Sequence, residues 1–165
     1  MRSWLVIFLA GLVFLPSAGA EAKRRKKQKV DYLALAGVLA RDGNYERAQN
    51  ALSQVDTEDE DLDRARFHLV RGIIRLNQQL YEQAAEDFRS SIDASQRQQA
   101  EDEEAEGPKP VIYVYLGQAQ FYSQKYEAAL ESMKKAGAAA EEIRSTYALR
   151  AEALWKLERY DEAWE

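Results

Sequence analysis

Small, aromatic and apolar residues recur at fixed spacings along residues 30–165. Four tyrosines lie 36, 45 and 34 residues apart, and each is followed three residues later by an alanine. A glycine or alanine lies nine positions before each tyrosine, and a larger apolar residue follows the first three alanines by four positions. The four sets are Ala36, Gly72, Gly117 and Ala151; Tyr45, Tyr81, Tyr126 and Tyr160; Ala48, Ala84, Ala129 and Ala163; and Leu52, Phe88 and Met133. The chain therefore repeats one structural unit.

Each unit is predicted to be a hairpin of two antiparallel helices. A small residue on the first helix lets the backbone of the second approach, and the tyrosine fills the wedge beside the turn. One hairpin cannot bury its apolar face alone, so neighbouring hairpins are expected to stack. The predicted helices span residues 31–41 and 45–54, 62–77 and 81–94, 111–123 and 126–136, with a fourth hairpin that starts near 141 and stops at 165.

The spacing and residue types of these units resemble the tetratricopeptide repeat (TPR) family, whose repeat is about 34 residues long. Leu116-Gly117 and the run from Tyr126 to Ala129 fit the family pattern best. The resemblance implies an all-α fold, namely a right-handed α-solenoid of stacked antiparallel helix hairpins. It covers about 3.5 TPR-like repeats, in residues 30–56, 62–94, 109–137 and 141–165.

The turn inside each hairpin departs from the family pattern in three of the four units. Gly43 supplies the usual glycine in the first turn, whereas Gln79, Gln124 and Glu158 stand at the matching positions of the others. The family proline between repeats is also missing. The missing glycines weaken the prediction of the turn but not of the stacking, and without the prolines the repeat boundaries can shift by a few residues.

A polar insertion over residues 95–108 explains the 45-residue spacing. It is rich in Gln and Glu, so the preceding helix is expected to continue for a few turns until Gly107-Pro108-Lys109-Pro110 ends it. Its carboxylates indicate a solvated helix end or loop, and the alternative is recruitment of a basic partner. The five carboxylates are Glu101, Asp102, Glu103, Glu104 and Glu106.

The acidic segment before residue 64 partly matches the pattern of a calcium-binding loop. Asp59, Asp61 and Asp63 alternate, but Arg64 replaces the glycine of an EF-hand loop and Val70 replaces its closing glutamate. We therefore expect no metal site here, and instead expect Asp61 or Asp63 to cap the next helix.

The amino terminus has the layout of a secretory signal. Arg2 precedes an apolar run of twelve residues over 4–15, Pro16 breaks it, and Ala18-Gly19-Ala20 fits a signal peptidase. The run is short for a membrane span. We therefore expect residues 1–20 to be a signal peptide that is cleaved after Ala20, with export to the periplasm.

Residues 21–29 are expected to form a flexible basic segment. Six positive charges over 23–29 follow the apolar run directly, and positive flanks tend to stay cytoplasmic. The alternative is therefore an uncleaved leader that anchors the repeats at the inner membrane, facing the cytoplasm. Residues 23–29 could also make weak contact with anionic lipids. They lack the interleaved aromatic residues on which nucleic-acid bases stack.

The sequence offers little catalytic chemistry. His68 is the single histidine and lies within a predicted helix, where a histidine more often packs than acts as a ligand or base. No other histidine can activate a serine, and no glycine-rich loop could hold a phosphate. Cysteine is absent, which removes thiolate metal sites and cysteine nucleophiles. We expect no cofactor and no enzyme. A hydrolase built from two carboxylates is a weak third alternative.

In the TPR family the first helices of the hairpins line an inner, concave groove. Family members that clamp a peptide carboxylate use Lys, Asn and Arg there, whereas this chain has mainly Leu, Ile, Val and Ala. The resemblance therefore implies an apolar groove that would hold a hydrophobic or amphipathic segment, although the same side chains would serve equally to pack the repeats together. Helical spacing also places Leu33 near this groove, and the predicted partner-binding residues are Leu69, Ile73, Leu76, Val114, Gln118, Phe121 and Trp155.

Charge separates the repeats from the leader. Residues 30–165 carry 27 acidic and 16 basic side chains, a net charge of −11, while the whole chain has −5. An acidic array is a poor nucleic-acid binder, and electrostatic steering favours basic protein segments. The family resemblance and the signal-like leader together imply a non-enzymatic scaffold that holds a peptide or protein partner in a bacterial envelope assembly. The fourth hairpin is unfinished, so it is either a stub or the beginning of a longer array, and we expect the longer array.

Overall fold

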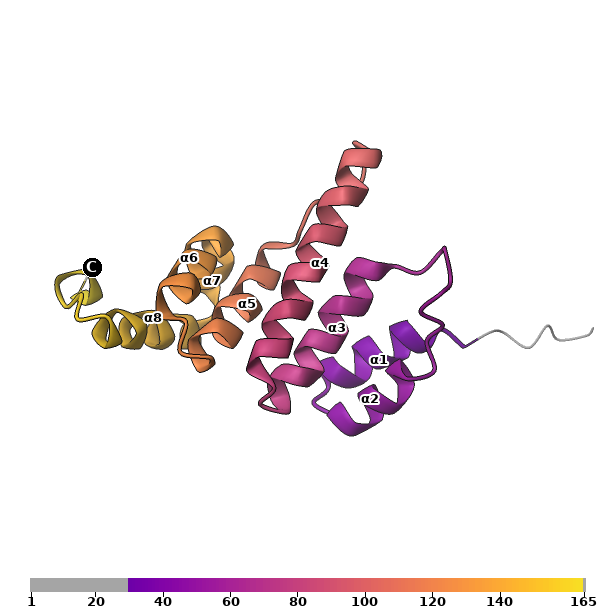
Figure 1. Ribbon diagram of the computed structural model, residues 1–165, viewed down its shortest axis with the longest axis horizontal. Helices are drawn as coiled ribbons and strands as arrows, with labels where there is room; N and C mark the ends of the chain where they lie inside the picture. Colours follow the sequence, from indigo (N-terminus) through magenta and orange to yellow (C-terminus); the bar gives the residue numbers. More distant parts are fainter. Residues whose placement is uncertain (1–29, 165) are drawn as a thin grey trace, which may run out of the picture. The chain divides into compact units, whose positions relative to one another are not determined.

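The computed structural model describes residues 30–164, so the predicted signal peptide (1–20) and basic segment (21–29) lie outside the described residues. Within that range the structure is helical and contains no β-strand (Figure 1). Its elements in chain order are α1 (Tyr32–Arg41), α2 (Tyr45–Leu52), α3 (Arg64–Asn77), α4 (Tyr81–Glu101), α5 (Pro110–Tyr122), α6 (Tyr126–Ala136), α7 (Ala138–Glu142), α8 (Arg144–Lys156) and the 3-10 helix η1 (Asp161–Trp164).

The first six helices form three hairpins that stack in chain order. The pairs α1–α2, α3–α4 and α5–α6 each pack side by side, and α3 contacts the first hairpin while α5 contacts the second (Figure 1). The predicted ranges of these helices agree with the structure to within two residues, apart from the longer α4. The all-α solenoid of stacked helix hairpins is therefore confirmed.

Close contact at the small residues holds each hairpin together. A Cβ atom added to Gly72 would lie 2.7 Å from Cε1 of Phe88, and one added to Gly117 would lie 2.9 Å from Cγ of Met133. The Gly117 position also lies 3.3 Å from the carbonyl oxygen of Ala129, whose side chain is fully buried. Because protein interiors are packed without spare volume, a side chain at Gly72 or Gly117 would require the neighbouring helix or its side chain to shift.

All four hairpin turns have the same backbone geometry, with or without glycine. Gly43 has φ of 77°, and Gln79, Gln124 and Glu158 have φ of 61°, 61° and 59°. Each turn is closed by the same backbone hydrogen bond, such as Lys125 N–H to the carbonyl of Gln120 at 2.9 Å. The turns therefore follow the family pattern where the sequence departs from it, and the three non-glycine residues bear left-handed backbone strain.

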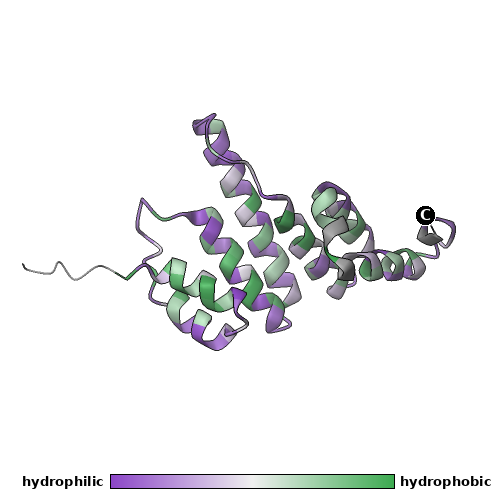
Figure 2. Ribbon diagram, turned by 180° about the vertical axis from the view of Figure 1, so that it is seen from behind, coloured by the Kyte–Doolittle hydropathy of each residue, from purple (hydrophilic) through white to green (hydrophobic). Residues whose placement is uncertain are grey.

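Helix α4 runs past its hairpin, as the polar insertion predicted. It ends at Glu101, and residues 96–101 are exposed and mostly hydrophilic (Figure 2). Helix α5 then starts at Pro110, whose missing N–H costs nothing at the first position of a helix. Of the two candidate caps for α3, Asp63 is the one used, because its Oδ1 accepts a 2.9 Å hydrogen bond from Arg66 N–H.

The carboxyl-terminal part differs from the prediction. The short helix α7 comes between the third and fourth units, and α8 begins at Arg144 instead of near residue 141. Gly137, with φ of 52°, separates α6 from α7. Helix α8 packs against α5, α6 and α7. No second helix of the fourth hairpin is formed within the described residues, so Ala151 and Trp155 stay exposed.

Across residues 30–164, no helix combines the length and the apolar character that a membrane crossing requires.

Replacing Gln124 by glycine should stabilise the fold, because glycine adopts a positive φ without strain. We expect a gain of about 0.5–1 kcal/mol in the free energy of unfolding, measured by urea denaturation. The matched control is Gln96→Gly, at an exposed position inside α4, which should cost about 1 kcal/mol. A loss of stability in Gln124→Gly would contradict the strain assigned to this turn.

Candidate functional site

The structure places most of the predicted groove residues in packing contacts between repeats. Leu69, Ile73 and Leu76 are half-buried and pack against the apolar cluster formed by α4 and α5. Val114 is fully buried and Phe121 is 7% exposed, so neither side chain is accessible to a partner. These two residues are therefore withdrawn from the candidate surface, as is Leu33, which is also 7% exposed.

Gln118 and Trp155 differ from the other predicted groove residues. Gln118 is half-buried, and Trp155 is 59% exposed on α8 with Lys156 Nζ 5.2 Å from its ring centre. Helical spacing could not separate accessible positions from stacking positions, because both lie on the first helix of a hairpin and both favour apolar side chains. Trp155 is the predicted residue that the structure leaves open to a partner most fully.

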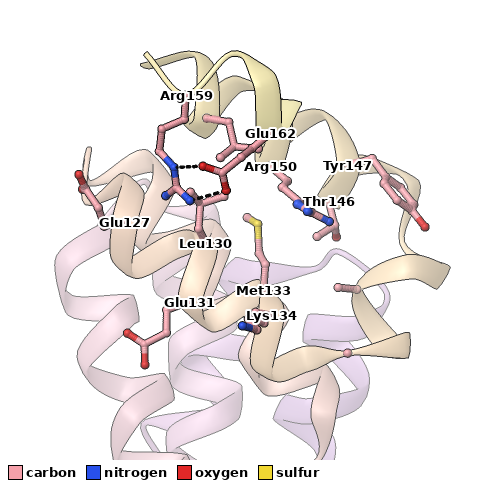
Figure 3. Close-up of a pocket in the computed structure, with 13 residues that line it drawn as sticks. Glu127, Leu130, Glu131, Met133, Lys134, Thr146, Tyr147, Arg150, Arg159 and Glu162 are labelled. Carbon is pink, nitrogen blue, oxygen red and sulfur yellow. Dashed lines mark hydrogen bonds and ion pairs between the residues drawn. The ribbon is translucent and has the colours of Figure 1, made fainter. Parts of the chain in front are cut away.

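A cleft of about 590 Å³ lies between α6 on one side and α8 with η1 on the other (Figure 3). Its apolar wall consists of Leu130, Met133 and Leu154, and the last two are almost fully buried. The remaining lining residues are Glu127, Glu131, Lys134, Gly137, Ala140, Thr146, Tyr147, Arg150, Arg159 and Glu162. The volume lies within the range of about 300–1,000 Å³ that is typical of ligand pockets.

Several charges around the cleft neutralise one another. Arg159 Nε donates to Glu162 at 2.6 Å, and this contact lowers the pKa of Glu162 below its ordinary value. Glu131 lies 2.8 Å from Lys135, which likewise lowers the pKa of the glutamate. Both pairs are exposed, so they contribute little to stability. These two ion pairs engage the carboxylates of Glu131 and Glu162.

Three features of the cleft are left over. Among the side chains that the structure describes, Lys134 and Arg150 form no ion pair. Thr146 is 3% exposed, and its Oγ1 has no hydrogen-bond partner within the described part of the chain. A buried hydroxyl without a partner is uncommon in a folded protein. Figure 3 shows Arg150 beside Thr146 on α8, whereas Lys134 lies on the other side of Met133. The positive charge of Arg150 adds to that of Arg159 in lowering the pKa of Glu162.

A second cleft, of about 520 Å³, lies between α3, α4 and the segment that leads into α5. Its two serine hydroxyls are already bonded, Ser91 to the carbonyl of Ala65 at 2.7 Å and Ser95 to the carbonyl of Ser91 at 3.1 Å. It leaves no buried polar group to bind a ligand, so the α6–α8 cleft is the stronger candidate.

The sequence signals missed this site. Thr146 and Arg150 lie at positions where the repeat pattern has no distinctive residue, and the cleft depends on the placement of α8 after the unpredicted helix α7. No spacing rule would have brought them together with Lys134 of α6.

Asp87 is the buried carboxylate among the described residues, so it is the first candidate for the catalytic carboxylate of a hydrolase. Its side chain is 2% exposed and accepts hydrogen bonds from Arg71 Nη2 at 2.6 Å and Arg75 Nη1 at 2.8 Å. His68 Nδ1 lies 3.6 Å away. Burial would raise the pKa of Asp87, but His68, Arg71 and Arg75 outweigh it and hold the pKa below the ordinary value. The group is therefore a fixed anion that ties α3 to α4, which suits a structural role.

Metal coordination has no evident site in the described chain, because residues 30–164 contain no group of three or more histidine, aspartate or glutamate side chains placed to hold an ion.

Comparison with known proteins agrees with the fold. No protein-family model matches the chain, and no curated protein matches it. Among solved structures, MamA AMB-1 is similar, with a TM-score of 0.63, 25% sequence identity, and coverage of 81% of this chain and 72% of that chain. The protein is thus an all-α helical-repeat protein with a TPR-like fold, an architecture that acts as a protein-interaction scaffold.

Asp87→Asn should destabilise the protein at pH 7 by about 2 kcal/mol, because two partly buried arginines lose their counter-ion. A carboxyl with a lowered folded pKa contributes stability that is fully present above its unfolded pKa of about 3.9 and is lost as pH falls through the folded value. The difference in the free energy of unfolding between the wild type and the variant, measured by urea denaturation, should therefore narrow below about pH 4. A gap that is constant from pH 7 to pH 3 would contradict this.

Proposed function

We propose that this protein is an exported, non-enzymatic scaffold that holds a protein partner in an envelope-associated assembly. The observation that carries the proposal is a TPR-like stack of hairpins with an open cleft between α6 and α8. A stack of this kind offers an extended surface on which a partner segment can lie. The fixed Asp87 cluster argues against the carboxylate hydrolase, because an acid–base residue needs a pKa nearer to the working pH.

The alternative is a cytoplasmic adaptor tethered to the membrane by an uncleaved leader. It is favoured by one observation, the six positive charges over residues 23–29, since such flanks oppose translocation. Export is favoured by the Ala18-Gly19-Ala20 pattern and the short apolar run. The partner-holding function is the same in both cases, and only the compartment differs.

Site-specific photo-cross-linking in cells tests the scaffold. A photoreactive amino acid at Tyr147, which is 53% exposed beside the cleft, should cross-link to one defined partner polypeptide. The same group at Trp155 reports on the surface predicted from the sequence, and at Arg97, exposed near the end of α4, it serves as the control. A cross-link at Trp155 alone would support the scaffold function but would place the partner on the surface near Trp155 instead of at the cleft. No cross-link at either aromatic position would refute the scaffold.

The same purified species reports on the compartment. Mass spectrometry of its amino terminus should find Glu21 as the first residue if the protein is exported and the leader is removed. A protein that begins at Met1 would favour the tethered adaptor.

A further inference from the structure

We propose that one face of α1, formed by Tyr32, Leu35 and Val38, docks on the surface of an anionic lipid bilayer, while the basic residues 23–29 pair with the lipid phosphates. The inference goes beyond the proposed function, because it concerns how the array is held at a membrane and not which protein it holds. It is carried by an apolar helix with one exposed side that follows a run of six cations in the sequence.

Helix α1 differs from a typical surface helix. From Tyr32 to Ala40 it has no charged side chain and consists of Tyr, Leu, Ala, Gly and Val (Figure 2). A helix at a protein surface normally turns a polar face to water, and a helix that is apolar on all sides is normally buried. Helix α5 is similarly rich in apolar residues, but α4, α6 and α8 pack around it. Among the described elements, α1 packs on α2 and α3 alone.

The side of α1 that these two helices leave open presents three large apolar side chains. Tyr32, Leu35 and Val38 are 38%, 41% and 45% exposed. Their spacing of three residues places them next to one another on the helix surface, whereas Leu33 and Ala36 on the other side are buried in the core. The α1 face is therefore a compact apolar patch on the first helix of the hairpin array (Figure 1).

The charge that precedes this patch in the sequence identifies its occupant. Residues 23–29 contain six Lys and Arg side chains and no acid, and only Val30 and Asp31 separate them from α1. Clusters of cations are attracted to anionic lipids, and an apolar helix face adds burial below the headgroups. Stable membrane binding generally requires two such weak signals together. In this chain the two signals follow each other directly.

The acidic residues at the ends of α1 do not oppose this docking strongly. Oδ1 of Asp31 accepts a 2.8 Å hydrogen bond from Ala34 N–H at the start of the helix, and Asp42 lies 3.5 Å from Nε of Arg41. The net charge of −11 is spread over residues 30–165, and exposed charges are largely screened beyond about 8 Å at physiological salt. The cations of residues 23–29 therefore dominate the attraction to a membrane at this end of the chain.

A second copy of the chain is a less suitable occupant of the α1 face. A stable protein interface buries about 800 Å² on each partner, which is more than the exposed parts of three side chains supply. A bilayer needs no matching protein surface, and the basic segment supplies the remaining attraction. Tyr32 also suits the bilayer, because tyrosine is enriched at the boundary between lipid and water.

Fluorescence quenching by lipid tests the docking on the full chain. The sequence contains no cysteine, so Val38→Cys or Leu80→Cys gives a single site for a fluorophore. Leu80 lies at the start of α4 and serves as the control. The vesicles consist of phosphatidylcholine with or without phosphatidylglycerol, and bromine atoms on their acyl chains quench a fluorophore that enters the bilayer.

We expect quenching at position 38 with the phosphatidylglycerol vesicles, and none at position 80 or with phosphatidylcholine alone. Absence of quenching at position 38, or equal quenching at positions 38 and 80, would overturn the inference. The result does not depend on cleavage of the leader, because the fluorophore reports on the α1 face itself.

A matched pair of substitutions assigns the quenching to the apolar face. In the chain labelled at position 38, Leu35→Asp should reduce quenching about fivefold at a sub-saturating vesicle concentration, because a charged side chain replaces one that enters the lipid. Leu80→Asp changes the same residue type at the same exposed fraction, 41%, and should leave quenching intact. Circular dichroism should show the same helix content in both variants. Unchanged quenching in a folded Leu35→Asp variant would contradict the docking.

Analytical ultracentrifugation of the same samples without vesicles tests the second copy. A monomer would support the bilayer as the occupant. A dimer that Leu35→Asp dissociates would assign the α1 face to self-association and overturn the inference. Cross-linking at Tyr147 and Trp155 reports on α8 instead of α1, so it decides the scaffold function separately.

Discussion

The close approach of two helices within each hairpin is the constraint on which the rest of this protein depends. At Gly72 and Gly117 the neighbouring helix comes so near that a single added carbon would overlap Phe88 or Met133. The hairpins then pack on one another in chain order. The turns within them keep a left-handed residue even where glutamine or glutamate stands in place of glycine.

Much of this fold could be predicted from the sequence because the signals are local and repeated. The spacing from Gly117 to Tyr126 and Ala129 locates two helices and the turn between them, and α5 and α6 begin within one residue of their predicted starts. Helix α7 escaped prediction because its alanine-rich sequence fits no repeat position. The role of Val114 and Phe121 also escaped, since an apolar residue on a first helix serves a groove and an interior equally well.

The candidate site lies where the repeat pattern weakens. Inside the array, successive hairpins pack directly on one another, whereas α8 packs against α6 with α7 inserted before it. The resulting cleft combines an apolar wall with Arg150, Lys134 and the unbonded Thr146 hydroxyl. The regularly stacked hairpins therefore form a rigid support, and the candidate site lies where α7 and α8 depart from that stacking. The buried Asp87 cluster belongs to the support, since its hydrogen bonds from Arg71 and Arg75 tie α3 to α4.

One pair of substitutions tests the packing constraint most directly. Gly37 and Gly72 both lie inside first helices, but a Cβ at Gly37 would meet its nearest neighbour, Arg66, at an ordinary 3.6 Å, whereas at Gly72 it would meet the buried ring of Phe88 at 2.7 Å. The change in the free energy of unfolding should therefore have opposite signs. Gly37→Ala should gain about 0.5–1 kcal/mol from helix propensity, and Gly72→Ala should lose about 2 kcal/mol through overpacking. Equal gains in both variants would show that the helices do not need glycine at their crossing and would contradict the account.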